Sequence, residues 1–431
     1  MSKTRDKLSL AGVYEFRSGL SKPRSAFGTG APFLSFKDVF YNSAVPEPLK
    51  ELVESSAKEQ HNCSVRRGDV FLTRTSETMD ELGMSCVALK DIPGATFNGF
   101  CKRLRPKVAD QIVPEYARYF FRSKRFRDQV NAMATMSTRA SLNNEMLERL
   151  EIDTPAIVEQ SAIGAILGTL DEKIELNHKM NQTLEEIAKA IFKSWFVDFD
   201  PVRAKAEGRP TGLPPEISDL FPDELVDSEI GEIPKGWDVG TLSDVADITM
   251  GQSPPGGTYN DDGVGLPFYQ GSTDFGFRFP SLRKYCSEPK RLADADDVLI
   301  SVRAPVGDLN RAKDDCCIGR GLASVRAKNS LQTWVFYRCK FLSKQLETFN
   351  SEGTVFGSIN GKDLKGLPTI LAPEVLCKAF DEIAKPMDDA VRNRTVEIEV
   401  LTELRDTLLP KLISGDLRIP DAEKFLEEAG L

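Results

Sequence analysis

Residues that could carry out catalysis are few and scattered in this 431-residue chain. No glycine-rich P-loop for nucleotide phosphates occurs, and no Asn/Asp-Pro-Pro-aromatic motif that would grip a target adenine. Asp171 and Lys173 have the Asp-x-Lys spacing of some nuclease sites, but they lie in a heptad pattern, where the solvated face of a helix is the better interpretation. The Phe27–Gly30 stretch hints at a methyl-donor loop, yet no convincing strand precedes it. We therefore expect no catalytic residues.

Metal-binding residue types are also poorly arranged. The chain has eight cysteines and only two histidines, His61 and His178, and no Cys-x-x-Cys pair. This pattern predicts free thiols in a reducing cytosol and no metal site. No run of 18 apolar residues occurs, and the charged N-terminus lacks the apolar core of a signal peptide. We expect a cytoplasmic protein that does not enter a membrane.

Binding is better supported than catalysis, because polar and basic residues gather in turns beside predicted strands. Such side chains suit phosphates and base edges. For each of them a solvated surface charge remains the more common role. Residues 1–150 hold 24 Lys/Arg against 17 Asp/Glu, whereas residues 151–235 hold 8 against 18, so the first globular region is the basic one. The candidate DNA contacts are Ser21, Lys22, Arg24, Arg74, Ser76 and Arg139, followed by Ser253, Tyr269, Gln270, Ser272, Arg278, Arg303 and Ser358.

The elements that must position these residues occur twice. Much of the stretch from Leu142 to Trp195 is repeated 217 residues later without a gap. Residues 68–74, an acidic turn followed by an apolar strand and Arg74, are also similar to residues 296–303, which end in Arg303. Aromatic, basic helices are predicted at residues 114–126 and 333–342. The chain is therefore a tandem duplication.

Both copies of the repeated stretch contain apolar residues every three or four positions, and these fit a 3.5-residue repeat over four heptads. That pattern is typical of a coiled-coil seam. A helix from about residue 155 to 192 would be about 55 Å long. Asn177 and Arg394 are candidates for one polar layer that sets the register. The predicted seam includes Leu170, Ile174, Asn177, Leu184, Met387, Val391, Arg394 and Leu401.

These patterns predict an α+β fold: two mostly-β globular domains in tandem repeat, separated by two long coiled-coil helices that can pack on each other. The expected boundaries are 1–153 for the first domain, 154–197 for the first helix, 198–236 for a linker, 237–372 for the second domain, 373–415 for the second helix and 416–431 for a tail. A duplicated module with stiff helices suits a rigid, repetitive ligand such as duplex DNA. The alternatives are a coiled-coil scaffold that assembles proteins without sequence-specific DNA binding, and a self-contained enzyme, which the missing motifs disfavour.

Several motifs resemble one known family, the type I restriction–modification specificity subunits (HsdS). The resemblance covers nearly the whole chain in organisation, but its specific motifs lie in the linker and the helices. They are DFDPVRAK at 198–205, GRP at 208–210, EIGEIPKGW at 229–237, LDEKIELN at 170–177, NQTLE at 181–185 and LPKLISG at 409–415. The lead-in at 233–237 has no counterpart before the first domain, so the sequence leaves open how the N-terminal strand is anchored.

The resemblance implies a non-catalytic subunit of a methyltransferase and endonuclease complex. Each domain would be a target recognition domain that reads one half of a bipartite site in double-stranded DNA. The two domains would be in pseudo-twofold tandem repeat, separated by two long antiparallel coiled-coil helices that fix the gap between the halves. Two modification subunits would supply the adenine methyltransferase, and restriction subunits would supply an ATP-dependent translocase and endonuclease. S-adenosylmethionine, ATP and Mg are expected on those partners, and no cofactor is expected in this chain.

Overall fold

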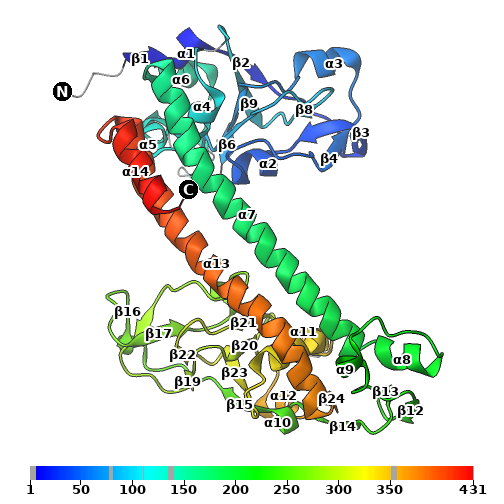
Figure 1. Cartoon of the computed structure of the whole chain (residues 1–431). Coiled ribbons are helices and arrows are strands. Elements are labelled where there is room, and N and C mark those ends of the chain that lie inside the picture. The colour runs from blue at the N-terminus through cyan, green and yellow to red at the C-terminus, as the bar shows by residue number, and fades with distance from the viewer. Residues whose placement is uncertain (1–5, 77–80, 110, 134–139, 351–356, 431) are drawn as a thin grey trace. The chain divides into compact units, whose positions relative to one another are not determined.

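The computed structural model describes residues 6–76, 81–109, 111–133, 140–350 and 357–430. The chain divides into two compact units (Figure 1). Unit 1 comprises Met1–His178 and Thr395–Leu431, and unit 2 comprises Lys179–Arg394. Both units mix helices with sheets, which confirms the predicted α+β class.

Unit 1 begins with short strands and ends its globular part at residue 154. Its strands are β1 (Asp6–Ser9), β2 (Tyr14–Ser18), β3 (Phe27–Leu34), β4 (Glu51–Val53), β5 (Val70–Thr73), β6 (Thr75–Ser76), β7 (Ser85–Val87), β8 (Thr96–Phe97), β9 (Cys101–Pro106), β10 (Ala140–Ser141) and β11 (Glu151–Thr154). Its short helices are α1 (Leu10–Val13), α2 (Phe36–Tyr41), α3 (Ala57–Asn62), α4 (Pro114–Phe120), α5 (Lys124–Met133), α6 (Asn144–Arg149) and α14 (Ile419–Glu428), with a 3-10 turn at Arg24–Ala26.

Unit 2 follows a closely related order. Its strands are β12 (Leu225–Ser228), β13 (Gly231–Pro234), β14 (Asp238–Thr241), β15 (Ala246–Met250), β16 (Tyr259–Asn260), β17 (Leu266–Tyr269), β18 (Tyr285–Cys286), β19 (Leu292–Ala293), β20 (Val298–Ser301), β21 (Leu309–Arg311), β22 (Cys316–Ile318), β23 (Leu322–Ala327) and β24 (Pro368–Leu371). Its helices are α8 (Asp200–Ala206), α9 (Pro215–Ser218), α10 (Leu242–Val245), α11 (Gln332–Thr348) and α12 (Gly361–Lys365), with 3-10 turns at Gly256–Thr258 and Ser272–Asp274.

Each unit is built on one four-stranded antiparallel sheet. The strand order is β2-β9-β5-β7 in unit 1 and β15-β23-β20-β21 in unit 2. The apolar strands β5 and β20 lie inside these sheets and are buried along their whole length, as expected for strands covered on both faces. A second sheet, β4-β3-β8 or β16-β18-β17-β22-β19, accompanies each one. The duplication predicted from sequence is thus a duplication of sheet topology.

The two long helices are α7 (Ile157–Phe196) and α13 (Glu374–Ser414), close to the expected 154–197 and 373–415. The repeated stretch that begins at Leu142 is not helical throughout, because α6 and then β11 precede α7. Pro155 separates β11 from α7, since proline favours an extended conformation in the residue before it. The helix therefore begins later than the sequence repeat does.

Within each unit, α7 and α13 pack in opposite directions. In unit 1, Lys173 lies 3.2 Å from Glu397, whereas Asp171 accepts a hydrogen bond of 2.9 Å from Arg405. In unit 2 the rings of Phe192 and Phe380 are 5.3 Å apart.

The seam residues differ in how far they are buried. Leu170, Ile174, Asn177, Val391 and Leu401 are buried, and Leu184, Met387 and Arg394 are half-buried. Arg394 donates to the carbonyl of Ala390 in its own helix at 3.2 Å. A shared layer of Asn177 and Arg394 stays a prediction.

The N-terminal strand is anchored without the lead-in that unit 2 has. β1 pairs antiparallel with β11, from Asp6 opposite Thr154 to Ser9 opposite Glu151. β14 pairs with β24 in the same way. The strand before each long helix therefore pairs with a strand near the start of the globular domain in the same unit, β1 in unit 1 and β14 in unit 2.

The eight cysteines are all buried and unpaired. In the described part of the chain, no helix combines the length and the apolar character needed to cross a membrane.

Candidate nucleic-acid interface

In unit 2, three loops meet at one edge of the four-stranded sheet because neighbouring strands are antiparallel. Met250 at the end of β15 pairs with Ala323, and Ser301 at the end of β20 pairs with Leu322 at the start of β23. The loops that leave these ends, together with residues 270–274 and 357–360, form what we call the unit 2 loop edge. In unit 1, the end of β2 pairs with Lys102 and the end of β5 pairs with Cys101, so residues 19–26, 74–76, 98–102 and 141–144 form the equivalent unit 1 loop edge.

Three polar residues of the unit 2 loop edge are joined by hydrogen bonds to one hydroxyl, that of Ser253. The amide of Gln270 donates to Ser253 Oγ at 2.9 Å, and the backbone N–H of Arg320 donates to the same oxygen at 3.3 Å. Gln270 and Arg320 are exposed. Ser253 and Gln270 were predicted from the sequence, whereas Arg320 was not. The flanking glycines, Gly319 and Gly321, were the available signal.

A second pair on this edge is Arg303 and Ser358, which form an isolated antiparallel bridge. The N–H of Ala304 donates to the carbonyl of Gly357 at 3.0 Å. Both predicted residues are exposed. The edge thus offers two exposed guanidinium groups, an exposed amide and two hydroxyls, which are the groups that read base edges and bind phosphates.

Glycines allow these loops to touch. A Cβ on Gly251 would overlap the carbonyl oxygen of Gly319, and one on Gly321 would overlap that of Gln270. In unit 1, a Cβ on Gly19 would overlap the carbonyl oxygens of Phe97 and Asn98. Such close backbone approach is possible only without a side chain. Both loop edges are therefore held in place by equivalent glycine contacts.

The unit 1 loop edge carries concentrated positive charge. Lys102 donates to Asn144 Oδ1 at 2.8 Å, and its pKa is lowered by partial burial and by the nearby Arg74. Two neighbouring cations repel each other, and an incoming anion such as phosphate relieves that repulsion. Phe100 beside them is 60% exposed, so its ring is available for stacking. Arg74 was predicted from sequence, whereas Lys102 and Phe100 were not.

The other unit 1 candidates have varied surroundings. Ser21 and Arg24 are exposed. Lys22 lies 2.7 Å from Glu59 and lowers the pKa of that carboxyl to about 2. Ser76 donates to Glu81 at 3.3 Å. Arg139 lies outside the described residues.

Two unit 2 candidates point inward instead of toward a ligand. Arg278 is 2% exposed and donates to Asp388 at 2.8 Å and to Glu185 at 3.0 Å. Tyr269 is buried, and burial raises the pKa of its hydroxyl. A sequence cannot distinguish an arginine in a turn that faces solvent from one that reaches a carboxylate on a distant helix. We remove both from the contact candidates. Ser272 remains half-exposed.

The alignment of Arg74 with Arg303 is wrong by one residue. The backbone N–H of Arg74 donates to Phe100 and that of Val302 donates to Gly321, both at 2.9 Å. Arg74 therefore corresponds to Val302, and Arg303 corresponds to Thr75. The two arginines leave their sheets on successive residues and do not occupy equivalent positions.

Comparisons with known proteins agree with this duplicated organisation. A model of the type I restriction modification DNA specificity domain matches residues 6–186 and 234–397. A Methanocaldococcus jannaschii protein described as the specificity subunit of the MjaX type I restriction enzyme is 32% identical over 323 residues, which cover 73% of this chain and 71% of that protein. The MjaIX specificity subunit of the same organism is 25% identical over 420 residues, covering 93% of this chain and 90% of the relative.

A solved structure shares the fold. The S subunit of the type I restriction–modification system from M. genitalium superposes with a TM-score of 0.61 at 15% identity, covering 94% of this chain and 95% of that one.

Proposed function

The chain belongs to the family of type I restriction–modification specificity subunits, and we propose that its two loop edges each read one half of a bipartite DNA site. The observation that carries this proposal is the repetition of the edge itself. In both units the same strand ends meet, and the same glycine contacts hold the loops together. Because the polar side chains on the two edges differ, the two half-sites would differ in sequence.

The exposed arginines are the strongest candidates for direct base contact. A guanidinium that binds a guanine through two hydrogen bonds contributes about 1–3 kcal/mol of base discrimination. Arg303 and Arg320 in unit 2 have the exposure for that role. Lys102 and Arg74 in unit 1 form the more compact charge cluster, which suits a phosphate. Lysine contacts of that kind strengthen binding to every sequence alike.

The chemistry would be supplied by partner subunits. Two modification subunits would carry S-adenosylmethionine and methylate adenine, and restriction subunits would use ATP and Mg to translocate and cut. The long helices α7 and α13 and the linker beside them are the proposed binding surfaces. The chain itself would contribute sequence recognition and assembly.

Methylation-sensitive sequencing of cells that express the chain with its modification subunit tests the proposal. The expected result is a split motif methylated on adenine that disappears without this chain. Arg303→Ala and Arg320→Ala should relax or abolish recognition of one half of the motif and leave the other half intact. Unchanged, fully specific methylation in both variants would remove these arginines from the reading surface.

The matched control is Lys328→Ala. Lys328 lies just past the opposite end of β23 from Arg320 and donates to the carbonyl of Ser243 at 2.6 Å. The substitution removes one positive charge from unit 2 without changing the loop edge, so the methylated motif should not change. If the two proteins associate and no motif appears, the chain acts as a scaffold and the proposal fails.

A further inference from the structure

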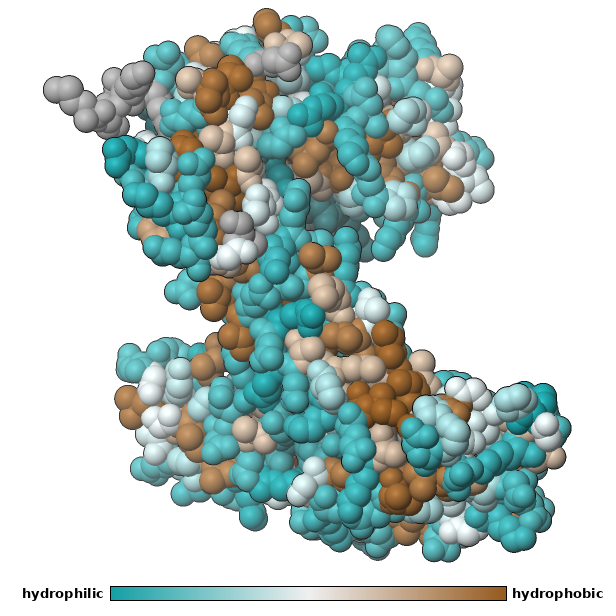
Figure 2. Space-filling model, in the orientation of Figure 1, coloured by the Kyte–Doolittle hydropathy of each residue, from teal (hydrophilic) through white to brown (hydrophobic). Residues whose placement is uncertain are grey.

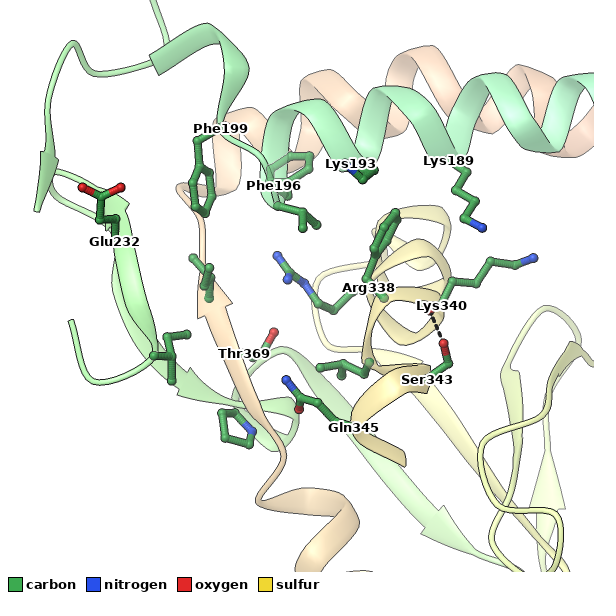
Figure 3. A pocket seen from close by; sticks show the side chains of 16 residues that line it. Lys189, Lys193, Phe196, Phe199, Glu232, Arg338, Lys340, Ser343, Gln345 and Thr369 are labelled. Carbon is green, nitrogen blue, oxygen red and sulfur yellow. Dashed lines mark hydrogen bonds between the residues drawn. The ribbon is translucent and has the colours of Figure 1, made fainter. Parts of the chain in front are cut away.

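Unit 2 contains a pocket of about 420 Å³ that the DNA-reading proposal does not use. Figure 3 shows its walls, which are the C-terminal end of α7, helix α11, strand β24 and the segment around β13. Its lining includes four basic side chains, Lys189, Lys193, Arg338 and Lys340, and one acidic side chain, Glu232. Lys193 and Lys340 are ion-paired with Asp198 and Glu185, and Glu232 lies 3.2 Å from Arg203.

Arg338 is the unusual member of this set. It is 5% exposed, and its Nε and one terminal nitrogen, Nη2, have no hydrogen-bond acceptor among the described residues. Its guanidinium lies 5.2 Å from the ring centre of Phe192 and 5.3 Å from that of Trp334. Burial lowers its pKa to about 10, so the group is still charged at neutral pH. A buried charge without an anion is costly.

A second unsatisfied group lies in the same pocket. The hydroxyl of Thr369 on β24 is buried and has no hydrogen-bond partner among the described residues. Arg338 extends from α11 into the space beside β24, and the Thr369 hydroxyl faces this space (Figure 3). Two buried donors in one pocket form a site for an acceptor with more than one oxygen.

The other repeat shows that the charge is not required by the fold. Tyr337 and Tyr119 donate to equivalent aspartates, Asp388 and Asp171, so the next residues, Arg338 and Phe120, also correspond. Phe120 is fully buried in the core of unit 1. The same helix position therefore holds an aromatic side chain in one repeat and an unpaired cation in the other.

We infer that this pocket binds a carboxylate presented by an apolar peptide segment of the modification subunit. The inference rests on the proposed function, because that function supplies the modification subunit as the partner. A carboxylate matches the planar guanidinium and can also accept from the Thr369 hydroxyl. The pocket would exist in unit 2 only, so the two repeats would differ in how they bind a partner.

The rim favours a peptide over a nucleic-acid phosphate. Val197 and Ile230 line the pocket and are 37% and 43% exposed. The C-terminal part of α7 presents an apolar surface in Figure 2, and Ile187 there is 43% exposed. Exposed apolar residues around buried donors suit an acidic residue flanked by aliphatic or aromatic side chains. None of the loop-edge residues lines this pocket.

The first experiment measures binding of phenylacetate, with phenylacetamide as its neutral match, to the full chain by NMR or calorimetry. Wild-type protein should bind the acid and prefer it to the amide. Arg338→Met should weaken phenylacetate binding by about tenfold or more, as expected when a charge-assisted hydrogen bond is lost, and leave amide binding unchanged. Thr369→Val should weaken it by about threefold.

Thr369→Val keeps shape and charge, so it remains informative if Arg338→Met fails to fold. Absence of phenylacetate binding to wild type, or equal binding by wild type and folded variants, would overturn the inference.

The second experiment identifies the source of the carboxylate in the assembled complex. The photo-crosslinking residue p-benzoylphenylalanine replaces Gln345, an exposed residue of the pocket lining. The expected product is a modification-subunit peptide that contains Asp or Glu between apolar residues. A crosslink to DNA, or to a peptide without an acidic residue, or no crosslink in a complex that still methylates its motif, would overturn the inference and leave the proposed function standing. Failure of the subunits to associate at all would instead refute the proposed function.

Discussion

The two units hold their long helices with equivalent carboxylates but with different partners. Asp171 in unit 1 accepts hydrogen bonds from Tyr119 at 2.7 Å, Arg118 at 2.8 Å and Arg405 at 2.9 Å. Its side chain is 16% exposed. The carboxylate thus joins the aromatic helix α4 to both α7 and α13 within this unit.

Asp388 in unit 2 lies at the matching position of α13. It accepts from Tyr337 at 3.4 Å, Arg278 at 2.8 Å, Arg311 at 2.7 Å and Thr333 at 3.0 Å, and its side chain is 4% exposed. The tyrosine is repeated, but both arginines come from the recognition domain and not from helices.

The carboxylate acceptor therefore belongs to the repeated framework, whereas the cations that bind it do not. In unit 2, a loop residue, Arg278, and a strand residue, Arg311, connect the sheet directly to the helix. Arg278 also lies 4.4 Å from the ring centre of Phe336. The sheet of unit 2 is therefore connected directly to α13 by buried ion pairs. In unit 1, the connection to the long helices is made through α4.

The largest expected effect comes from removing the more buried carboxylate. Asp388→Asn removes the carboxylate that Arg278 and Arg311 share, and leaves each guanidinium with one acidic partner, Glu185 and Asp296 respectively. Breaking a buried pair costs about 3–5 kcal/mol, so we expect a loss near the lower end of that range. The equivalent Asp171→Asn should cost less, about 1–3 kcal/mol, since its surroundings are more exposed.

Hydrogen exchange followed by mass spectrometry on peptides of α11 and α4 measures each unit separately. Equal losses of protection in the two variants, or a larger loss for Asp171→Asn, would contradict the contrast between the units.

Exchanging the residues at one equivalent helix position should have opposite effects on the two units. Arg338→Phe gives unit 2 the residue of unit 1 and should stabilise it by up to about 4 kcal/mol, since replacing a buried charge by an apolar group is often neutral or stabilising. Phe120→Arg should destabilise unit 1, because it buries a charge in the core. Denaturant unfolding followed by Trp334 fluorescence and by hydrogen exchange reports both changes. Destabilisation by Arg338→Phe would show that the cation supports the fold.

Disturbing the glycine contacts should impair one half-site at a time. Gly251→Ala forces a methyl group against the Gly319 carbonyl, and overpacking of this kind costs about 1–3 kcal/mol. We expect Gly251→Ala to abolish recognition of the half-site read by unit 2 and no other. Gly19→Ala should abolish recognition of the half-site read by unit 1. The control is Gly256→Ala, at a position in the same loop with open space around it. Methylation sequencing measures all three, and normal motifs after Gly251→Ala would refute the role of the contact.

The smallest expected effect concerns the ion pair between Lys22, on the unit 1 loop edge, and Glu59 of α3. A hydrogen bond from Lys22, together with hydrogen bonds from Ser56, lowers the pKa of Glu59 from 4.5 to about 2. Because the pKa is depressed in the folded state, its stabilising contribution is present above pH 4.5 and is lost as pH falls toward 2.

An NMR titration of the Glu59 carboxyl should show its midpoint near pH 2, and Lys22→Ala should move the midpoint back toward 4.5. A midpoint that does not change in the variant would show that Lys22 does not hold this carboxyl.

The large-scale organisation could be predicted from the sequence. Repeated positions 217 residues apart predicted two similar units, and heptads predicted both long helices to within three residues of their observed ends. These features depend on local periodicity, which a single sequence displays directly. The linker and helix motifs indicated the specificity-subunit family. Exposed turn residues such as Arg303 and Ser358 were also predicted, because turn residues follow strands in sequence.

Only the tertiary structure decided which polar residues face a ligand. Arg278 and Arg303 both occupy loops, yet one is buried against Asp388, 110 residues away, and the other is exposed. Arg320, Lys102 and the Arg338 pocket were likewise invisible, since their surroundings come from segments far apart in the chain. Charge pairing and burial depend on such long-range contacts, which no local pattern encodes.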